Sequence, residues 1–223
     1  MTFAELIAET FRRIGESQTS QVYWTVTDVK DALNEGYLDF CEQTRCYERE
    51  AEVECVSRVS LMDLRAAFPY PVLGIRRLYG RSFNAPLIPT TVKALDDRDN
   101  RWEMARGVVR RYFVRGLYWL GLYPFPDGRQ SFRVSITSLP DKLVEDLDEP
   151  QIPVQCHEAL IHYAIYDLKI QEDEVKEGLM AWEDYLKLLT VGTRYVGDQI
   201  RTPRTFIMGD GGRQGTGMAG WRY

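Results

Sequence analysis

The spacing of apolar residues changes twice along the chain, and this constrains its fold more than any other feature. Up to about residue 50 and again after about residue 150, apolar residues recur at three- and four-residue steps, which predicts helices. Between these segments apolar and polar residues alternate, which predicts strands with one buried face. The economical packing is an α+β fold, a helical bundle with an inserted antiparallel β-meander and an extended C-terminal tail.

The same changes divide the chain into four parts. We expect N-terminal helices over residues 1–49, an inserted β-rich subdomain over 50–140, C-terminal helices over 141–200 and an extended tail over 201–223. At 223 residues and 44% apolar composition, the chain is long enough to bury a sizeable core.

Local signals mark where the helices begin and end. The first helix stops at Gly15, and the second begins at Thr25, which can form a capping box with Asp28. Gly36 inside the second helix costs about 1 kcal/mol against Ala, so we expect a neighbouring helix to approach closely there. After Pro153 the helical pattern returns, weakens near residues 171–173 and continues, which predicts a helical hairpin or one long kinked helix. Its second half carries an apolar face of Val175, Leu179, Trp182, Leu186 and Leu189.

The strand candidates have turn signals between them. They are "EVECVSRVSL", "VLGIRRLYG", "VVRRYFV", "LYWLGLYPF" and "SFRVSITSL". Gly116 separates the third from the fourth, and the "PDG" at residues 126–128 turns the chain into the fifth. A short capped helix is expected to start near Thr90 or Thr91.

Charge and cysteine spacing exclude several classes of protein. A net charge of −5 argues against a broad basic face that grips nucleic acid. The four cysteines lack a C-x-x-C spacing, so reduced core thiols are favoured over a metal or disulfide site. The first residues carry charge throughout, unlike a signal peptide, and no stretch approaches the roughly 20 apolar residues of a membrane span. We expect a cytoplasmic protein or one assembled in a cytoplasm.

No catalytic motif emerges. His157 and His162 are five residues apart on one predicted helix and point in different directions, and Cys156 beside His157 is better explained as a core thiol. The acidic runs "VEDLDEP" and "ALDDRDNRW" lack the frame of a calcium loop, and the glycines of "GDGGRQGTG" have no strand before them and no helix after. We expect no enzyme, no cofactor and no metal.

The arginines and aromatic residues of "RRYFVRGLYWLGLYPFP" leave an alternative open. Arg110, Arg111 and Arg115 could combine with the rings into a stacking platform, making the chain a nucleic-acid-binding regulatory protein. A packed β-sheet explains the same residues and is favoured.

The last 23 residues combine six glycines with apolar side chains at both ends of the glycine run. They contain four arginines against one aspartate, a net charge of +3, while the rest of the chain carries −8. Ordering such a flexible basic segment costs about 1 to 2 kcal/mol per residue, which only apolar anchors on a partner can offset. An unstructured terminus is the simpler alternative.

Several phrases, in order, resemble the phage adaptor proteins, the head-tail connector subunits. In "YWTVTDVKDALNEGYLDFCEQT", five positions match that family's second-helix motif, with Gly36 where the family has a small residue: Trp24, Thr25, Asp28, Leu33 and Asn34. "YPVLGIRRLYGRSFNAPLIP", "LYWLGLYPFPDGRQSFRVSITSLP" and "DEPQIPVQCHEALIHYAIYDL" are similar to its sheet and C-terminal helix. The resemblance covers about residues 1–190 and leaves the glycine-rich end undefined.

The resemblance implies a structural adaptor in the neck of a tailed phage virion, assembled in the host cytoplasm. Identical subunits, about twelve, would form a ring below the portal protein, extend the DNA channel without sequence-specific binding, and present a platform for a tail or nozzle protein. Ring closure needs two different faces of one subunit, so we expect the short first helix to lie on a neighbour.

Within such a ring we expect two sets of residues to have specific roles. The tail would bind the portal through Arg201, Arg204, Phe206, Ile207, Met208, Trp221 and Tyr223. An acidic wall would keep DNA from sticking, and we expect its charge to come from Glu48, Glu50, Glu52 and Glu54.

Overall fold

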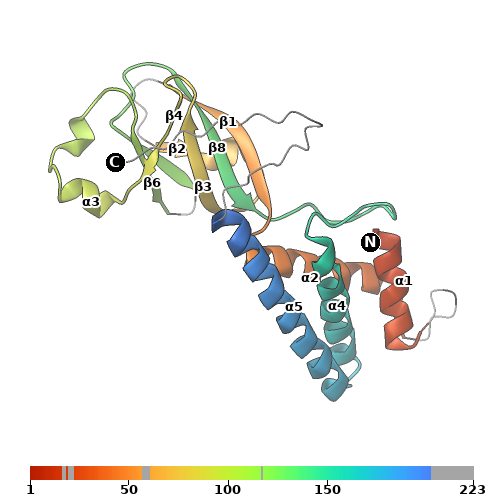
Figure 1. Ribbon diagram of the computed structural model, residues 1–223. Coiled ribbons are helices and arrows are strands. Elements are labelled where there is room, and N and C mark those ends of the chain that lie inside the picture. Colours follow the sequence, from red (N-terminus) through yellow and green to blue (C-terminus); the bar gives the residue numbers. More distant parts are fainter. Residues whose placement is uncertain (17–18, 20–22, 57–60, 117, 202–223) are drawn as a thin grey trace, which may run out of the picture.

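The protein has two parts, a helical bundle and a β-rich body (Figure 1). The computed structural model describes residues 1–201 except 17–18, 20–22, 57–60 and 117. About 45% of the described residues are helical and 24% are in strands, so the predicted α+β class is confirmed. The division of the chain at residues 49, 140 and 200 stays a prediction.

The bundle contains helices from both ends of the described chain. They are α1 (Phe3–Ile14), α2 (Val26–Thr44), α4 (His157–Gln171) and α5 (Val175–Arg201). The predicted end of α1 at Gly15 is confirmed, since Gly15 has the left-handed φ of 83°. The predicted start of α2 at Thr25 is also confirmed, because the Thr25 hydroxyl accepts from Asp28 N and the Asp28 carboxylate accepts from Thr25 N at 2.9 Å. These caps satisfy amide groups that a helix end leaves unpaired.

The close approach predicted at Gly36 is present. A Cβ at this position would lie 2.9 Å from Cβ and ring atoms of Tyr163 on α4, so only glycine lets α2 and α4 pack this closely. Of the two predictions for the C-terminal helical region, the helical hairpin is correct and the single kinked helix is excluded, because α4 and α5 are separate helices that form a hairpin. Lys169 stabilises the turn between them, its Nζ lying 3.0 Å from Glu172 and 2.5 Å from Glu174.

The expectation that α1 lies on a neighbouring subunit was wrong. Its apolar face is buried in its own bundle, with side chains exposed by at most 3%: Phe3, Leu6, Ile7 and Phe11. The N terminus of α1 is also tied to the segment before α4, since Phe3 N donates to Asp148 O at 2.7 Å. A short helix needs a partner surface, and α4 and α2 supply it within the same chain.

The β body contains two sheets that share one core. One sheet has the order β1 (Glu48–Cys55), β8 (Gln130–Ser138), β3 (Val72–Gly80) and β4 (Ala85–Pro86). The other has β2 (Leu61–Asp63), β7 (Trp119–Tyr123), β6 (Arg111–Arg115) and β5 (Ile88–Pro89). The core between them draws on both sheets and their connections: Cys55, Met62, Leu64, Phe68, Leu78, Leu87, Val109, Tyr112, Leu120, Leu122, Phe132, Val134 and Ile136.

The strands are not all joined in the sequential order of a meander. Strands β6 and β7 form the expected antiparallel neighbours, but β8 lies between β1 and β3, and the short β5 runs parallel to β6. Alternation in sequence predicts which face of a strand is buried and does not name its partner. The short helix α3 (Val92–Asp96) begins after Thr91 as expected, and it lies at the edge of the β body away from the bundle (Figure 1).

The two parts meet near the start of β1. There Ser138 N donates to Tyr47 O at 3.0 Å, and the Arg49 guanidinium pairs with Asp141 at 2.8 Å while lying 3.6 Å from the centre of the Tyr70 ring. In Figure 1, α5 runs from the far end of the bundle toward the same junction. None of the helices in the described ranges has an apolar stretch long enough to cross a membrane.

Candidate interaction surfaces

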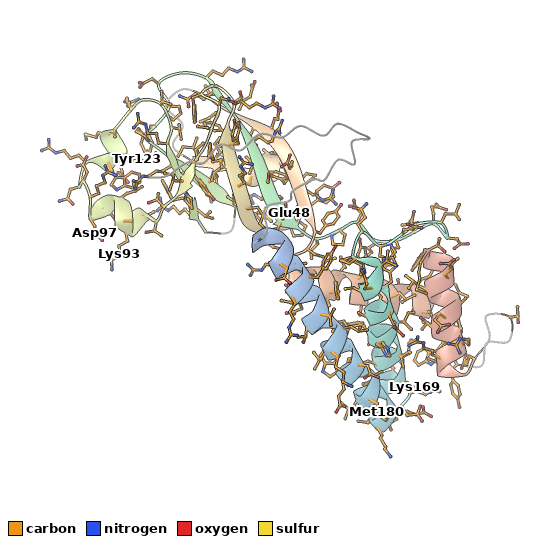
Figure 2. The ribbon with its side chains drawn as sticks, viewed as in Figure 1. Glu48, Lys93, Asp97, Tyr123, Lys169 and Met180 are labelled. Carbon is orange, nitrogen blue, oxygen red and sulfur yellow. The ribbon has the colours of Figure 1, made fainter. Side chains whose placement is uncertain are left out.

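The four glutamates expected to line a channel share the exposed face of β1. The strand alternates strictly, so its even-numbered residues point outward while Arg49, Ala51, Val53 and Cys55 are covered. Figure 2 labels Glu48, the first of them, near the end of α5. The structure therefore brings together the residues that the sequence placed on one face: Glu48, Glu50, Glu52 and Glu54.

Each of these glutamates has a partner from another segment of the sheet or its loops. Arg76 Nε lies 3.3 Å from Glu48, and the Ser135 hydroxyl donates to Glu50 at 2.6 Å. Glu52 pairs with Arg81, and Glu54 pairs with Arg129, whose Nε lies 3.0 Å away. Three of the four glutamates thus form a ladder of opposite charges with arginines, and such exposed pairs contribute about 0–1 kcal/mol each.

These partners could not be found from the sequence, because they lie far along the chain from β1 and join it only through strand pairing. The pairing also forms a shallow depression of about 400 Å³ beside the ladder. Its lining mixes charges and hydroxyls: Glu50, Arg77, Tyr79, Arg81, Asn84, Arg133 and Ser135.

The aromatic residues between positions 110 and 125 are mostly core residues. Tyr112 is 7% and Phe113 4% exposed, and Phe113 packs edge-to-face on Trp102 with ring centres 5.5 Å apart. Rings held in this way are not free to stack on bases. Trp119 is 42% exposed and is the exception among the rings of β6 and β7. The packing thus favours the sheet interpretation over the stacking platform.

The histidines and cysteines occupy structural positions. His157 is buried, its Nε2 lies 3.2 Å from Ile152 O, and burial lowers the pKa of its imidazole. His162 lies beside Arg13, 3.2 Å from its Nη1. All four cysteines are free, and Cys41 and Cys46 have Sγ atoms 3.8 Å apart. Within the described ranges no three His, Cys, Asp or Glu residues come together in a way that could hold a metal ion.

Asn34 fixes the segment that leads from the β body into α4. Its side chain is 4% exposed, its Nδ2 donates to Leu143 O at 3.0 Å, and its Oδ1 accepts from Leu143 N at 2.8 Å. Asn34 is one of the positions that match the adaptor motif, but the sequence gave no sign of its partner, which is 109 residues away.

Only part of the apolar face predicted for α5 packs in the bundle, through Trp182 and Leu189. Over residues 175–198 of α5, where burial is described, the buried positions are Gly178, Ala181, Tyr185 and Gly192. Three of the five predicted residues are substantially exposed, Val175 by 47%, Leu179 by 50% and Leu186 by 41%. Small residues and Tyr185 let α4 approach on one side, which leaves the larger aliphatic side chains on the next side of the helix.

The predicted tail contacts cannot be placed. Arg201 is the last residue of α5, and its side chain is outside the described part of the chain. The other tail residues assigned to portal binding also lie outside the described residues: Arg204, Phe206, Ile207, Met208, Trp221 and Tyr223.

The described residues thus present two distinct exposed surfaces, the partly exposed apolar side of α5 and the charge ladder of β1, on a two-part body. The model of the SU10 adaptor protein family matches residues 1–205. The chain belongs to this family, and the resemblance to phage adaptor proteins is confirmed. A search of curated proteins finds no match.

Family membership makes the chain a phage structural protein that contacts other proteins of the particle. Such adaptors are typically not enzymes.

Proposed function

We propose that this adaptor forms a ring below the portal of a tailed phage, extends the DNA channel and provides the platform on which a tail or nozzle protein docks. The match of the adaptor family over residues 1–205 carries the proposal. The ring has about twelve subunits and lies in the neck of the virion, after assembly in the host cytoplasm.

The face of β1 suits a wall along which DNA slides. The glutamates Glu48, Glu50, Glu52 and Glu54 repel phosphates, and their arginine neighbours reduce the net charge of the wall. Three of the four glutamates are paired with arginines, so β1 presents alternating charge to DNA and not a continuous row of cations, which agrees with passage of DNA without sequence-specific binding.

The last 23 residues attach the ring to the portal in this proposal. The segment has a net charge of +3, from four arginines and one aspartate, and carries apolar residues at both ends of its glycine run. The arginines suit an acidic portal surface, and the apolar residues suit pockets on it: Arg201, Arg204, Phe206, Ile207, Met208, Trp221 and Tyr223.

Co-purification with the portal of the same phage tests this function. The full chain is expected to remain bound to the portal, and a chain ending at residue 200 is expected to fold and to lose stable binding. Circular dichroism and a cooperative thermal transition check that the shortened chain is folded. If the full chain does not bind portal, the proposed function is wrong; if the shortened chain binds as fully, the role of the tail is wrong.

A further inference from the structure

One side of α5 carries an apolar ridge that its own subunit covers only in part. We call these residues the α5 ridge: Val175, Leu179, Trp182, Leu186 and Leu189. They follow one another at steps of four, three, four and three, the spacing of the seam of a coiled coil. The first, second and fourth are 41–50% exposed, while Trp182 and Leu189 are half-buried. The ridge is thus arranged for a partner that the isolated subunit does not contain.

The ridge continues onto neighbouring aromatic rings, and acidic residues of α2 lie near one of these rings. Trp182 lies against Tyr166, with ring centres 4.7 Å apart, and near Tyr163 at 6.3 Å. Glu35 and Asp39 of α2 lie close enough to Tyr163 to contribute to the rise of the pKa of its phenol, although burial is the larger cause. The surface around the ridge therefore combines apolar and aromatic area with negative charge.

Charge is divided unequally between the two parts of the molecule. Residues 1–49 and 141–200, which contain the bundle, have 10 Lys and Arg against 23 Asp and Glu, a net charge of −13. Residues 50–140 have 14 Lys and Arg against 9 Asp and Glu, a net charge of +5. One part of a subunit is thus electrostatically complementary to the other part of a second subunit.

The β body also has an apolar surface that could receive the ridge. A hollow of about 510 Å³ beside α3 is lined by Val92, Phe113 and Val114 among others. A second hollow of about 460 Å³ shares Val92 and Phe113 with it and has charged residues of both signs in its lining: Asp96, Glu103 and Arg115. Val114 is 48% and Val92 37% exposed, and Figure 2 shows Lys93 on α3 at this edge of the β body. Among the described residues, the ion pairs of the β body use Arg49, Arg65, Arg76, Arg81 and Arg129, which leaves Lys93 and Arg115 outside them.

We propose that the α5 ridge of one subunit docks onto the basic β body of a second copy, in the hollows beside α3. This inference rests on the proposed ring and identifies its subunit interface. The contact joins two different surfaces, so repetition can close a ring. Pairing of two α5 ridges would instead stop at a dimer and would bring two acidic surfaces together.

A pair of matched double variants tests the role of the ridge. Leu179→Glu with Leu186→Glu places two charges on the ridge, while Met180→Glu with Val191→Glu places two charges on another side of the same helix, at residues 61% and 51% exposed. Ring formation on purified portal, counted in electron micrographs, is expected to fall at least about tenfold for the first variant. The control variant is expected to form rings as the unchanged chain does. Because all four positions are exposed, both variants should fold.

Normal ring formation by the ridge variant would overturn this inference and leave the proposed function standing. Failure of the unchanged chain to form any ring would contradict the proposed function itself.

Cross-linking then identifies the surface that covers the ridge. A photoactivatable amino acid in place of Leu179 is used in rings assembled from equal amounts of isotope-labelled and unlabelled chains, so that links between copies are recognised by mass. Links between copies are expected at residues 88–115. Links only to the portal, only to the bundle of another copy or only within one copy would overturn the inference.

Discussion

Replacing Asn34 with Ala tests how the bundle holds the segment that leads from the β body to α4. The side chain is almost fully buried and makes two hydrogen bonds to the peptide groups of Leu143, at 2.8 and 3.0 Å. Its Nδ2 also donates to Lys30 O at 3.1 Å. Alanine removes all three interactions, but only the two to Leu143 join distant parts of the chain.

The size of the effect follows from the two groups left behind. The N–H and C=O of Leu143 would each lose a partner, and Leu143 itself is 7% exposed. An unsatisfied buried group costs about 1–3 kcal/mol, and water entering the space of the lost amide would recover part of this. We expect the free energy of unfolding to fall by about 2–4 kcal/mol, a large share of the roughly 5–15 kcal/mol of an ordinary domain.

Urea unfolding of the full chain, followed by tryptophan fluorescence, measures this loss, and hydrogen exchange measures protection of the Leu143 amide. The control is Asp31→Ala, an exposed change in the same helix, which should stay within about 0.5 kcal/mol of the unchanged chain. A loss below about 0.5 kcal/mol for Asn34→Ala, with unchanged protection at Leu143, would refute the reasoning.

The remaining predictions concern packing, pH and DNA. Gly36→Ala should destabilise the protein by about 1–2 kcal/mol in thermal unfolding, because overpacking against Tyr163 outweighs the better helix propensity of alanine. The control Gly197→Ala, with open space around the new methyl group, should not lower the stability. A Gly36→Ala variant more stable than the unchanged chain would contradict the packing argument. Hydrogen bonds from Arg12 and Arg13, one turn along α1, lower the pKa of Glu9 from 4.5 to about 2. The contribution of Glu9 to the stability of the folded protein is therefore present above about pH 4.5 and is lost as the pH falls toward 2. Glu9→Gln should flatten the pH dependence of stability in that window, and an unchanged slope would count against the ion pairs. In gel-shift assays at physiological salt, the full chain should show no specific band with single- or double-stranded DNA, whereas a specific band would favour the regulatory alternative.

Features that depend on neighbouring residues were predictable from the sequence. The capping box at Thr25, the helix end at Gly15 and the close contact at Gly36 each follow from the chemistry of one or a few adjacent residues. The α+β class was predictable for the same reason, since hydrophobic periodicity is a local property.

Features that depend on distant residues were not predictable. The sequence placed the glutamates of β1 on one face, but it could not show that β8 lies beside them or that Arg81 and Arg129 reach them. The predicted partner of α1 was wrong, because amphipathicity shows that a helix needs a partner surface but does not show which chain supplies that surface. On α5, the side that carries the small residues Gly178 and Ala181 is buried, because small residues let a neighbouring helix pack closely. The adjacent side, with the larger aliphatic residues, is the one that the sequence pattern predicted to be buried.

Electron microscopy of the full chain mixed with the portal of the same phage tests the central claim most directly. A ring coaxial with the portal, with its opening continuous with the portal channel, is the predicted result. Portals that remain bare at saturating chain concentration, or chains that attach singly around the portal without closing a ring, would contradict the account.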